Sequence, residues 1–124
     1  MQNHMLLYIG SVLTIIWGIA HLFPTKSVVQ GFGDISIDNR RIITMEWITE
    51  GVALIFIGAL VGAVTVVDPN HEVSTAVYTI SVIGLVVLAV VSLFTGFRIS
   101  FLPFRLCPFI FTLSAALIYF GGLL

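Results

Sequence analysis

The sequence predicts an all-α integral membrane protein, a single domain in which four transmembrane helices form a bundle. Of the 124 residues, 59% are hydrophobic and only 9% are charged, and the mean hydropathy is +1.16. A soluble domain carries roughly a quarter of its residues as Asp, Glu, Lys or Arg. The apolar residues form four long runs, and four spans of ~20 residues nearly exhaust such a chain. We therefore expect lipid to contact most of the surface, with no separate soluble domain.

The four helices are expected at about residues 5–23, 42–67, 74–97 and 109–124. The first run ends at Pro24, which cannot donate a hydrogen bond within a helix. It lacks the basic start and small-residue cleavage site of a signal peptide, so we interpret it as a retained span. The second run ends at the turn-like cluster of residues 68–72. Each run is helical because a backbone crossing lipid must satisfy its hydrogen bonds internally.

Similar motifs recur in the second and fourth runs, where residues 53–60 (ALIFIGAL) match residues 116–123 (ALIYFGGL). Tyr8 and Ser11 of the first run likewise align with Tyr78 and Ser81 of the third. Two repeated helical hairpins related by a pseudo-twofold axis would produce this pattern. Chance resemblance between apolar helices would produce it too, and both interpretations stay open.

The basic residues predict the orientation. All five lie in loops 24–41 and 98–108: Lys26, Arg40, Arg41, Arg98 and Arg105. By the positive-inside tendency these loops are cytoplasmic, and both termini are external.

Several functions are excluded by composition. A net charge of −1 with five basic residues gives no footprint for nucleic acid, and there is no phosphate-binding loop of the Walker type. The single cysteine, Cys107, cannot form an intrachain disulfide. We expect no catalytic residues and no stand-alone enzymatic activity.

Small and hydroxyl residues such as Ser11, Thr14 and Gly18 recur on one helix face and predict the bundle interior.

Two acidic residues stand inside the second apolar run. Glu46 and Glu50 lie four positions apart and share one helix face. Counted from Arg41 at ~1.5 Å per residue, they lie ~7 Å and ~13 Å into the hydrocarbon layer. A charge at the bilayer centre costs on the order of 3 kcal/mol, so each carboxyl must be paired, protonated or functional. We expect this face to pack inward against the first and third helices, with Glu50 buried.

Candidate partners lie at the same end of the bundle. His21 is predicted at a depth similar to that of Glu46, and Arg98 either extends toward water or turns toward the carboxylates. Purely structural interpretations also stay open, with Glu46 near a helix N-terminus and His21 as a packing residue. In that case Glu50 would be a protonated carboxyl that bonds across helices; its candidate partners are Thr14, Ser92 and Thr112. Trp17 and Trp47 flank the site or anchor the interface.

A metal site built from His21, Glu46 and Glu50 is conceivable, but it lacks the Glu-x-x-His pairs of two-metal bundles, and we expect no metal.

The segments Trp17 to Pro24 (WGIAHLFP) and Glu46 to Gly58 (EWITEGVALIFIG) resemble the DoxX-like small bacterial membrane proteins. The resemblance covers about the first half of the chain. The short, basic first loop of this chain departs from the pattern of the DoxX-like proteins. The resemblance implies four helices, a bacterial inner membrane and an association with quinol oxidase and other membrane redox complexes. Residue by residue, it reaches only His21, Glu46 and Glu50.

Two functional hypotheses follow. In the first, a pocket in the cytoplasmic leaflet, lined by His21, Glu46, Glu50 and Arg98, binds or relays a proton or a small lipophilic ligand such as a quinone. In the second, the chain is a non-catalytic accessory or structural subunit, and its polar residues only fix helices or contact a larger redox or transport complex. A homo-oligomer is compatible with either.

Overall fold

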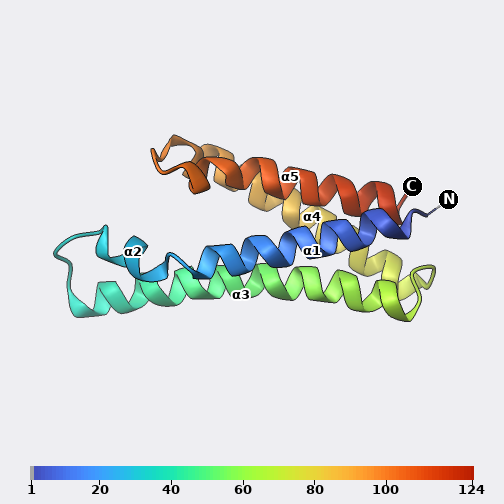
Figure 1. Ribbon diagram of the computed structural model, residues 1–124, viewed down its shortest axis with the longest axis horizontal. Helices are drawn as coiled ribbons and strands as arrows, with labels where there is room; N and C mark the ends of the chain where they lie inside the picture. The colour runs from blue at the N-terminus through green and yellow to red at the C-terminus, as the bar shows by residue number, and fades with distance from the viewer. Residues whose placement is uncertain (1) are drawn as a thin grey trace.

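The computed structural model describes residues 2–124 as a bundle of two helical hairpins (Figure 1). Its long helices are α1 (His4–Leu22), α3 (Ile37–Val67), α4 (Glu72–Phe94) and α5 (Leu102–Gly122). All four are long and apolar enough to cross a membrane. The predicted all-α four-helix membrane bundle is therefore confirmed, and both termini lie at one end of it, as Figure 1 shows.

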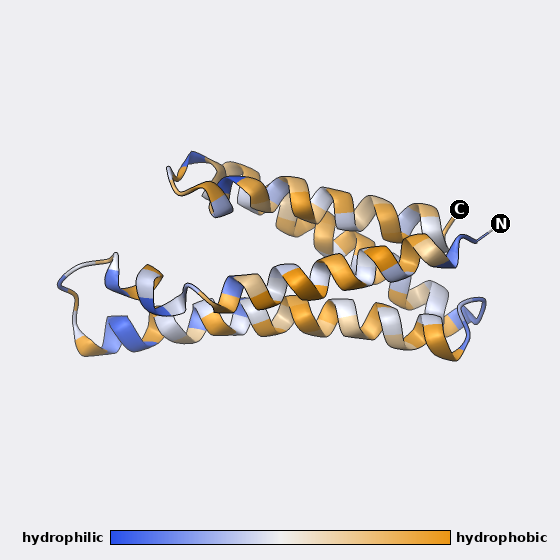
Figure 2. Cartoon of the chain, viewed as in Figure 1, coloured by the Kyte–Doolittle hydropathy of each residue, from blue (hydrophilic) through white to orange (hydrophobic). Residues whose placement is uncertain are grey.

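The loop between α1 and α3 differs from the prediction. It contains a short helix, α2 (Thr25–Gln30), and α3 begins at Ile37 rather than at residue 42. The Ser36 side chain caps α3 by accepting a hydrogen bond from the Asn39 amide at 3.1 Å. The first turns of α3 are polar, so hydropathy alone did not detect them (Figure 2).

The second basic loop is also shorter than predicted. A 3-10 turn (Gly96–Arg98) follows α4, and α5 begins at Leu102 rather than at residue 109. Pro103 occupies the first turn of α5, where a missing amide hydrogen leaves no bond unmade. Pro108 is accommodated inside the helix.

Glycines bring α1 and α3 into backbone contact. A Cβ atom added to Gly18 would lie 2.7 Å from the Gly51 carbonyl oxygen, and one added to Gly58 would lie 2.6 Å from the Ser11 carbonyl oxygen. The Ser11 hydroxyl donates a 2.6 Å hydrogen bond to the Gly58 carbonyl. Close approach and an interhelical hydrogen bond are the interactions that associate helices in lipid.

The interior matches the predicted stripes of small and hydroxyl residues, since Ser11, Thr14 and Gly18 are all buried. α1 packs against both α3 and α5, whereas α4 packs mainly on α5 and only lightly on α3. The two hairpins consequently diverge toward the loop end of the bundle (Figure 1).

The hairpins do not pack as equivalent repeats. Gly58 of α3 and Gly121 of α5 correspond in the repeated motif, yet both face α1. Tyr8 is 42% exposed, whereas the matching Tyr78 is fully buried. A pseudo-twofold axis would place these pairs in matching environments. Ser11 and the matching Ser81 are both buried, so the packing follows the sequence repeat at some positions and not at others.

The glycine contacts generate a stability prediction. We expect Gly58→Ala to destabilise the protein by about 1–3 kcal/mol, because its Cβ would overlap the α1 backbone. Gly84→Ala is the matched control, since no atom lies within 4 Å of a Cβ at that helical position. Thermal unfolding of both variants in mild detergent would measure the difference. Equal midpoints would contradict the proposed backbone contact.

Candidate functional site at the loop end of the bundle

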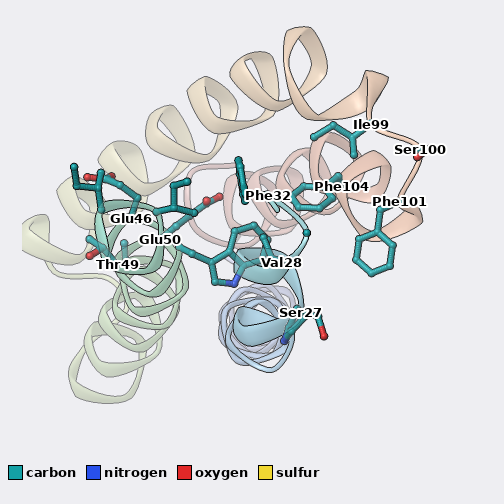
Figure 3. A pocket seen from close by; sticks show the side chains of 16 residues that line it. Ser27, Val28, Phe32, Glu46, Thr49, Glu50, Ile99, Ser100, Phe101 and Phe104 are labelled. Atoms are coloured by element: carbon teal, nitrogen blue, oxygen red, sulfur yellow. The ribbon is translucent and has the colours of Figure 1, made fainter. Parts of the chain in front are cut away.

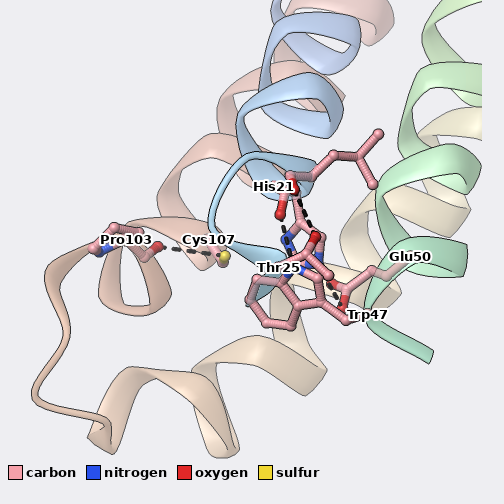
Figure 4. Close-up of polar contacts among 7 residues, drawn as sticks. His21, Thr25, Trp47, Glu50, Pro103 and Cys107 are labelled. Carbon is pink, nitrogen blue, oxygen red and sulfur yellow. Dashed lines mark hydrogen bonds and ion pairs between the residues drawn. The ribbon is translucent and has the colours of Figure 1, made fainter. Parts of the chain in front are cut away.

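A histidine and a carboxylate meet where α1 ends beside α3. The Nε2 atom of His21 lies 3.4 Å from Oε2 of Glu50, as Figure 4 shows. The His21 side chain is 7% exposed and that of Glu50 is 46% exposed. The predicted meeting of His21 with an acidic side chain of α3 is correct, but its partner is Glu50 rather than Glu46.

Trp47 fixes the position of His21. Its indole Nε1 donates a 2.8 Å hydrogen bond to the His21 carbonyl oxygen, and the two rings stack with centroids 3.9 Å apart. Phe104 of α5 packs edge-on against the other side of this indole, at 5.4 Å between centroids. Trp47 therefore joins the last turn of α1 to α3 and orients the imidazole toward Glu50.

The expectation that Glu50 would be buried is wrong, because its side chain is 46% exposed. The Leu22 side chain, at the end of α1, occupies the space above Gly51, so Glu50 lies level with the last turn of α1. A helix of 19 residues is ~28 Å long, close to the ~30 Å hydrocarbon thickness. A hydrocarbon layer matched to the length of α1 would place Glu50 near its boundary, with Glu46 one turn further out. Depth counted from Arg41 was misleading because α3 extends beyond the end of α1.

Two hollows meet at Glu50. The inner hollow, of about 410 Å³, lies between the hairpins. His21 and Glu50 are on one side, and Ser92 of α4 and Thr95, which follows α4, are among its other walls. The outer hollow, of about 1030 Å³, lies between α3, α2 and residues 99–104, and Glu46 is also in its wall (Figure 3). Glu50 is the acidic residue common to both.

The other proposed hydrogen-bond partners of Glu50 are not used. Each of the three hydroxyls donates instead to a carbonyl of its own helix: Thr14 to Gly10, Ser92 to Ala89 and Thr112 to Pro108. Throughout residues 2–124 the ion pair of Glu50 with His21 stands alone. The interpretation of Glu50 as a latch between those hydroxyls is therefore wrong.

Arg98 is not brought to the carboxylates. It is exposed in the 3-10 turn, and it lines neither the inner nor the outer hollow. The part of the chain that the structure describes shows no ion pair of Arg98 or Glu46. No group of three or more His, Cys, Asp or Glu residues forms a metal-binding cluster within that same part.

The sequence analysis did not predict that residues between 99 and 104 line the outer hollow. Phe101 and Phe104 line the outer hollow. The available signal was the grouping of aromatic residues in a supposed cytoplasmic loop, because a contiguous exposed apolar patch often marks a binding site. A third, smaller hollow of about 290 Å³ lies between Trp17, His21 and Cys107. The Trp17 indole nitrogen is buried and makes no hydrogen bond within the described chain.

The fold and this site define a polytopic α-helical membrane protein with a histidine–carboxylate pair between the two long helices of its first hairpin. No family model, curated protein or solved structure matches the chain. The resemblance to DoxX-like proteins thus stays a prediction from the sequence.

The two tryptophans provide a matched test of the hydrogen bond by which Trp47 holds the last turn of α1. We expect Trp47→Phe to lower stability by ~1 kcal/mol more than Trp17→Phe, the value of one hydrogen bond. Both changes remove an indole N–H and part of a ring, but only that of Trp47 is hydrogen-bonded. Thermal unfolding in detergent would measure both, and equal losses would show that the bond to the His21 carbonyl contributes nothing.

Proposed function

We propose that this chain binds a small lipophilic ligand with a hydrogen-bonding head, of the quinone type, or relays a proton, at the inner hollow. The observation that carries the proposal is the His21–Glu50 pair. His21 Nε2 is buried beside Glu50 and makes no hydrogen bond in the described chain. Both residues line a hollow large enough for a ring. A buried polar atom without a partner costs free energy that a ligand can recover.

The chemistry of the walls supports a head of this kind. An imidazole N–H can donate to a carbonyl oxygen, and the hydroxyls of Ser92 and Thr95 lie in the same hollow. Leu88, Val91 and Phe111 supply apolar surface for a ring. An apolar pocket with a few convergent polar groups is the usual form of a small-molecule site.

Access from lipid is the second supporting feature. α4 contacts α3 only lightly, and the hairpins diverge at this end (Figure 1). A ligand with an apolar tail can therefore enter sideways between α3 and α4 without crossing water.

The same lightly packed seam favours the second candidate, an accessory subunit of a larger membrane redox or transport complex, in which a partner helix or a second copy covers it. Purification in gentle detergent, followed by identification of co-purifying proteins and small molecules, distinguishes the two. A stoichiometric protein partner without any bound small molecule would favour the accessory function.

The ionisable group is tested at Glu50. We expect Glu50→Gln to weaken binding of decylubiquinone about tenfold, because Gln keeps the shape but cannot hold the charge that orients His21. Quenching of tryptophan fluorescence measures the binding, since Trp47 adjoins the pair.

Glu72→Gln is the matched control, because Glu72 is an exposed acidic residue in the first turn of α4, at the other end of the bundle. We expect it to bind the quinone as the unaltered protein does. Unchanged affinity in Glu50→Gln, or no measurable binding to either protein, would leave the quinone site without support.

We further propose a bacterial inner membrane location with loops 24–41 and 98–108 cytoplasmic and both termini external. The segregation of all five basic residues and the DoxX-like motifs support it. Both basic segments lie at the same end of the bundle, opposite the termini (Figure 1).

Cysteine labelling tests this orientation. In a background with Cys107 replaced by alanine, a membrane-impermeant maleimide should label Asn70→Cys in intact cells and Ser100→Cys only after lysis. Both positions are exposed in the structure and lie at opposite ends of the bundle. The reverse pattern would invert the proposed topology.

A further inference from the structure

The outer hollow has a more acidic wall than the inner hollow to which we assign the quinone-type site. Its wall carries the carboxylates of Glu46 and Glu50 and contains no lysine or arginine. Lys26, Arg40 and Arg41 belong to the same end of the chain but do not line it. A hollow with two acids and no protein cation is electrostatically matched to a positively charged occupant.

Aromatic rings face these acids. Trp47, Phe32, Phe101 and Phe104 line the hollow, and Figure 3 shows Phe101 and Phe104 across it from Glu46 and Glu50. The rings of Phe101 and Phe104 lie 5.8 Å apart and tilted. Aromatic faces attract organic ammonium groups, which lose less hydration on binding than a metal ion does. The combination selects an organic cation over an inorganic one.

The carboxylates of the hollow keep unused hydrogen-bonding capacity. His21, which does not line this hollow, is more than nine-tenths buried on the far side of Glu50, and its Nε2 lies 3.4 Å from that carboxylate without making a hydrogen bond in the described chain. Glu50 keeps nearly half of its side-chain surface exposed, so a donor in the hollow can still reach it. Glu46 contributes a second carboxylate with no ion pair among residues 2–124.

The position of the hollow indicates the chemistry of the part of the ligand beyond its charged head. The hollow lies at the loop end of the bundle, next to the end of α1, and Val28, Ile42, Ile43 and Ala53 give it apolar walls. A volume of about 1030 Å³ holds a head group and the start of a chain. We propose that the outer hollow binds the ammonium head of an amphiphilic organic cation whose apolar tail extends into the lipid.

The test uses N-dodecylpyridinium as probe and the full chain in nanodiscs. With Trp17→Phe as background, Trp47 is the sole tryptophan, and its quenching by the pyridinium ring reports occupancy. We expect Glu46→Gln to weaken binding about tenfold, because it removes a charge-assisted contact. Glu72→Gln, at the opposite end of the bundle, should bind as the background protein does.

A second pair of variants tests the rings. We expect Phe101→Leu to weaken binding about threefold, the size of a cation–π contact at an exposed site. Phe120→Leu is its control, because Phe120 is 55% exposed at the other end of α5, against 50% for Phe101. Equal affinity of Glu46→Gln and Glu72→Gln, or equally tight binding of a neutral dodecyl glycoside, would overturn the proposal.

Two further arms identify the source of the ammonium group and separate this site from the quinone-type site. If the natural occupant is a lipid head group, an ethanolamine lipid competes with the probe, and the probe should bind more weakly in nanodiscs of that lipid than in nanodiscs of a neutral glycolipid. If the natural occupant is a free cation, the probe should bind equally in both. Decylubiquinone binding should survive Glu46→Gln. Loss of quinone binding in that variant would show that the two hollows form one site and would overturn the proposal of a separate cation site.

Discussion

The backbone contact between α1 and α3 determines where every functional group of this protein lies. Gly18 and Gly51 face each other across the helices, and Gly58 faces Ser11 about two turns further along. Because none of these glycines carries a Cβ, the helices meet in a single antiparallel register. That register brings the end of α1 level with Glu50 and the His21 carbonyl within reach of the Trp47 indole. A shift of one helical turn would pair His21 with a different acid or with none.

The same register explains why the site lies at the loop end of the bundle. α1 ends at Leu22, while α3 extends back to Ile37. The extra turns of α3 have α2 for a neighbour rather than the rest of the bundle, and they leave space that the aromatic residues at 101 and 104 partly fill. Polar groups cost less here than at the bilayer centre. The half-exposed carboxylate of Glu50 is therefore compatible with a lipid-embedded fold.

Hydropathy predicted the four helices, the buried stripe on α1 and the presence of a polar site, because each depends on which residues tolerate lipid. It could not predict which acid meets His21, since that depends on glycine contacts between helices. It also missed α2 and the first turns of α3 and α5, which are too polar or too short to register as spans. Arg98 was assigned to the site on proximity in the sequence pattern, but the 3-10 turn leaves it exposed.

The site exists because the two hairpins are joined firmly at only one end. Near the termini, the Asn3 amide donates a 2.9 Å hydrogen bond to the Gly121 carbonyl, and the Tyr78 and Thr65 hydroxyls bond at 2.9 Å between α4 and α3. No comparable bond between α3 and α4 occurs at the loop end within residues 2–124. The hairpins therefore diverge there, and hollows remain where closer packing would have buried His21 and Glu50 completely. Firm packing at one end thus lets the other end stay open to lipid without loss of the fold.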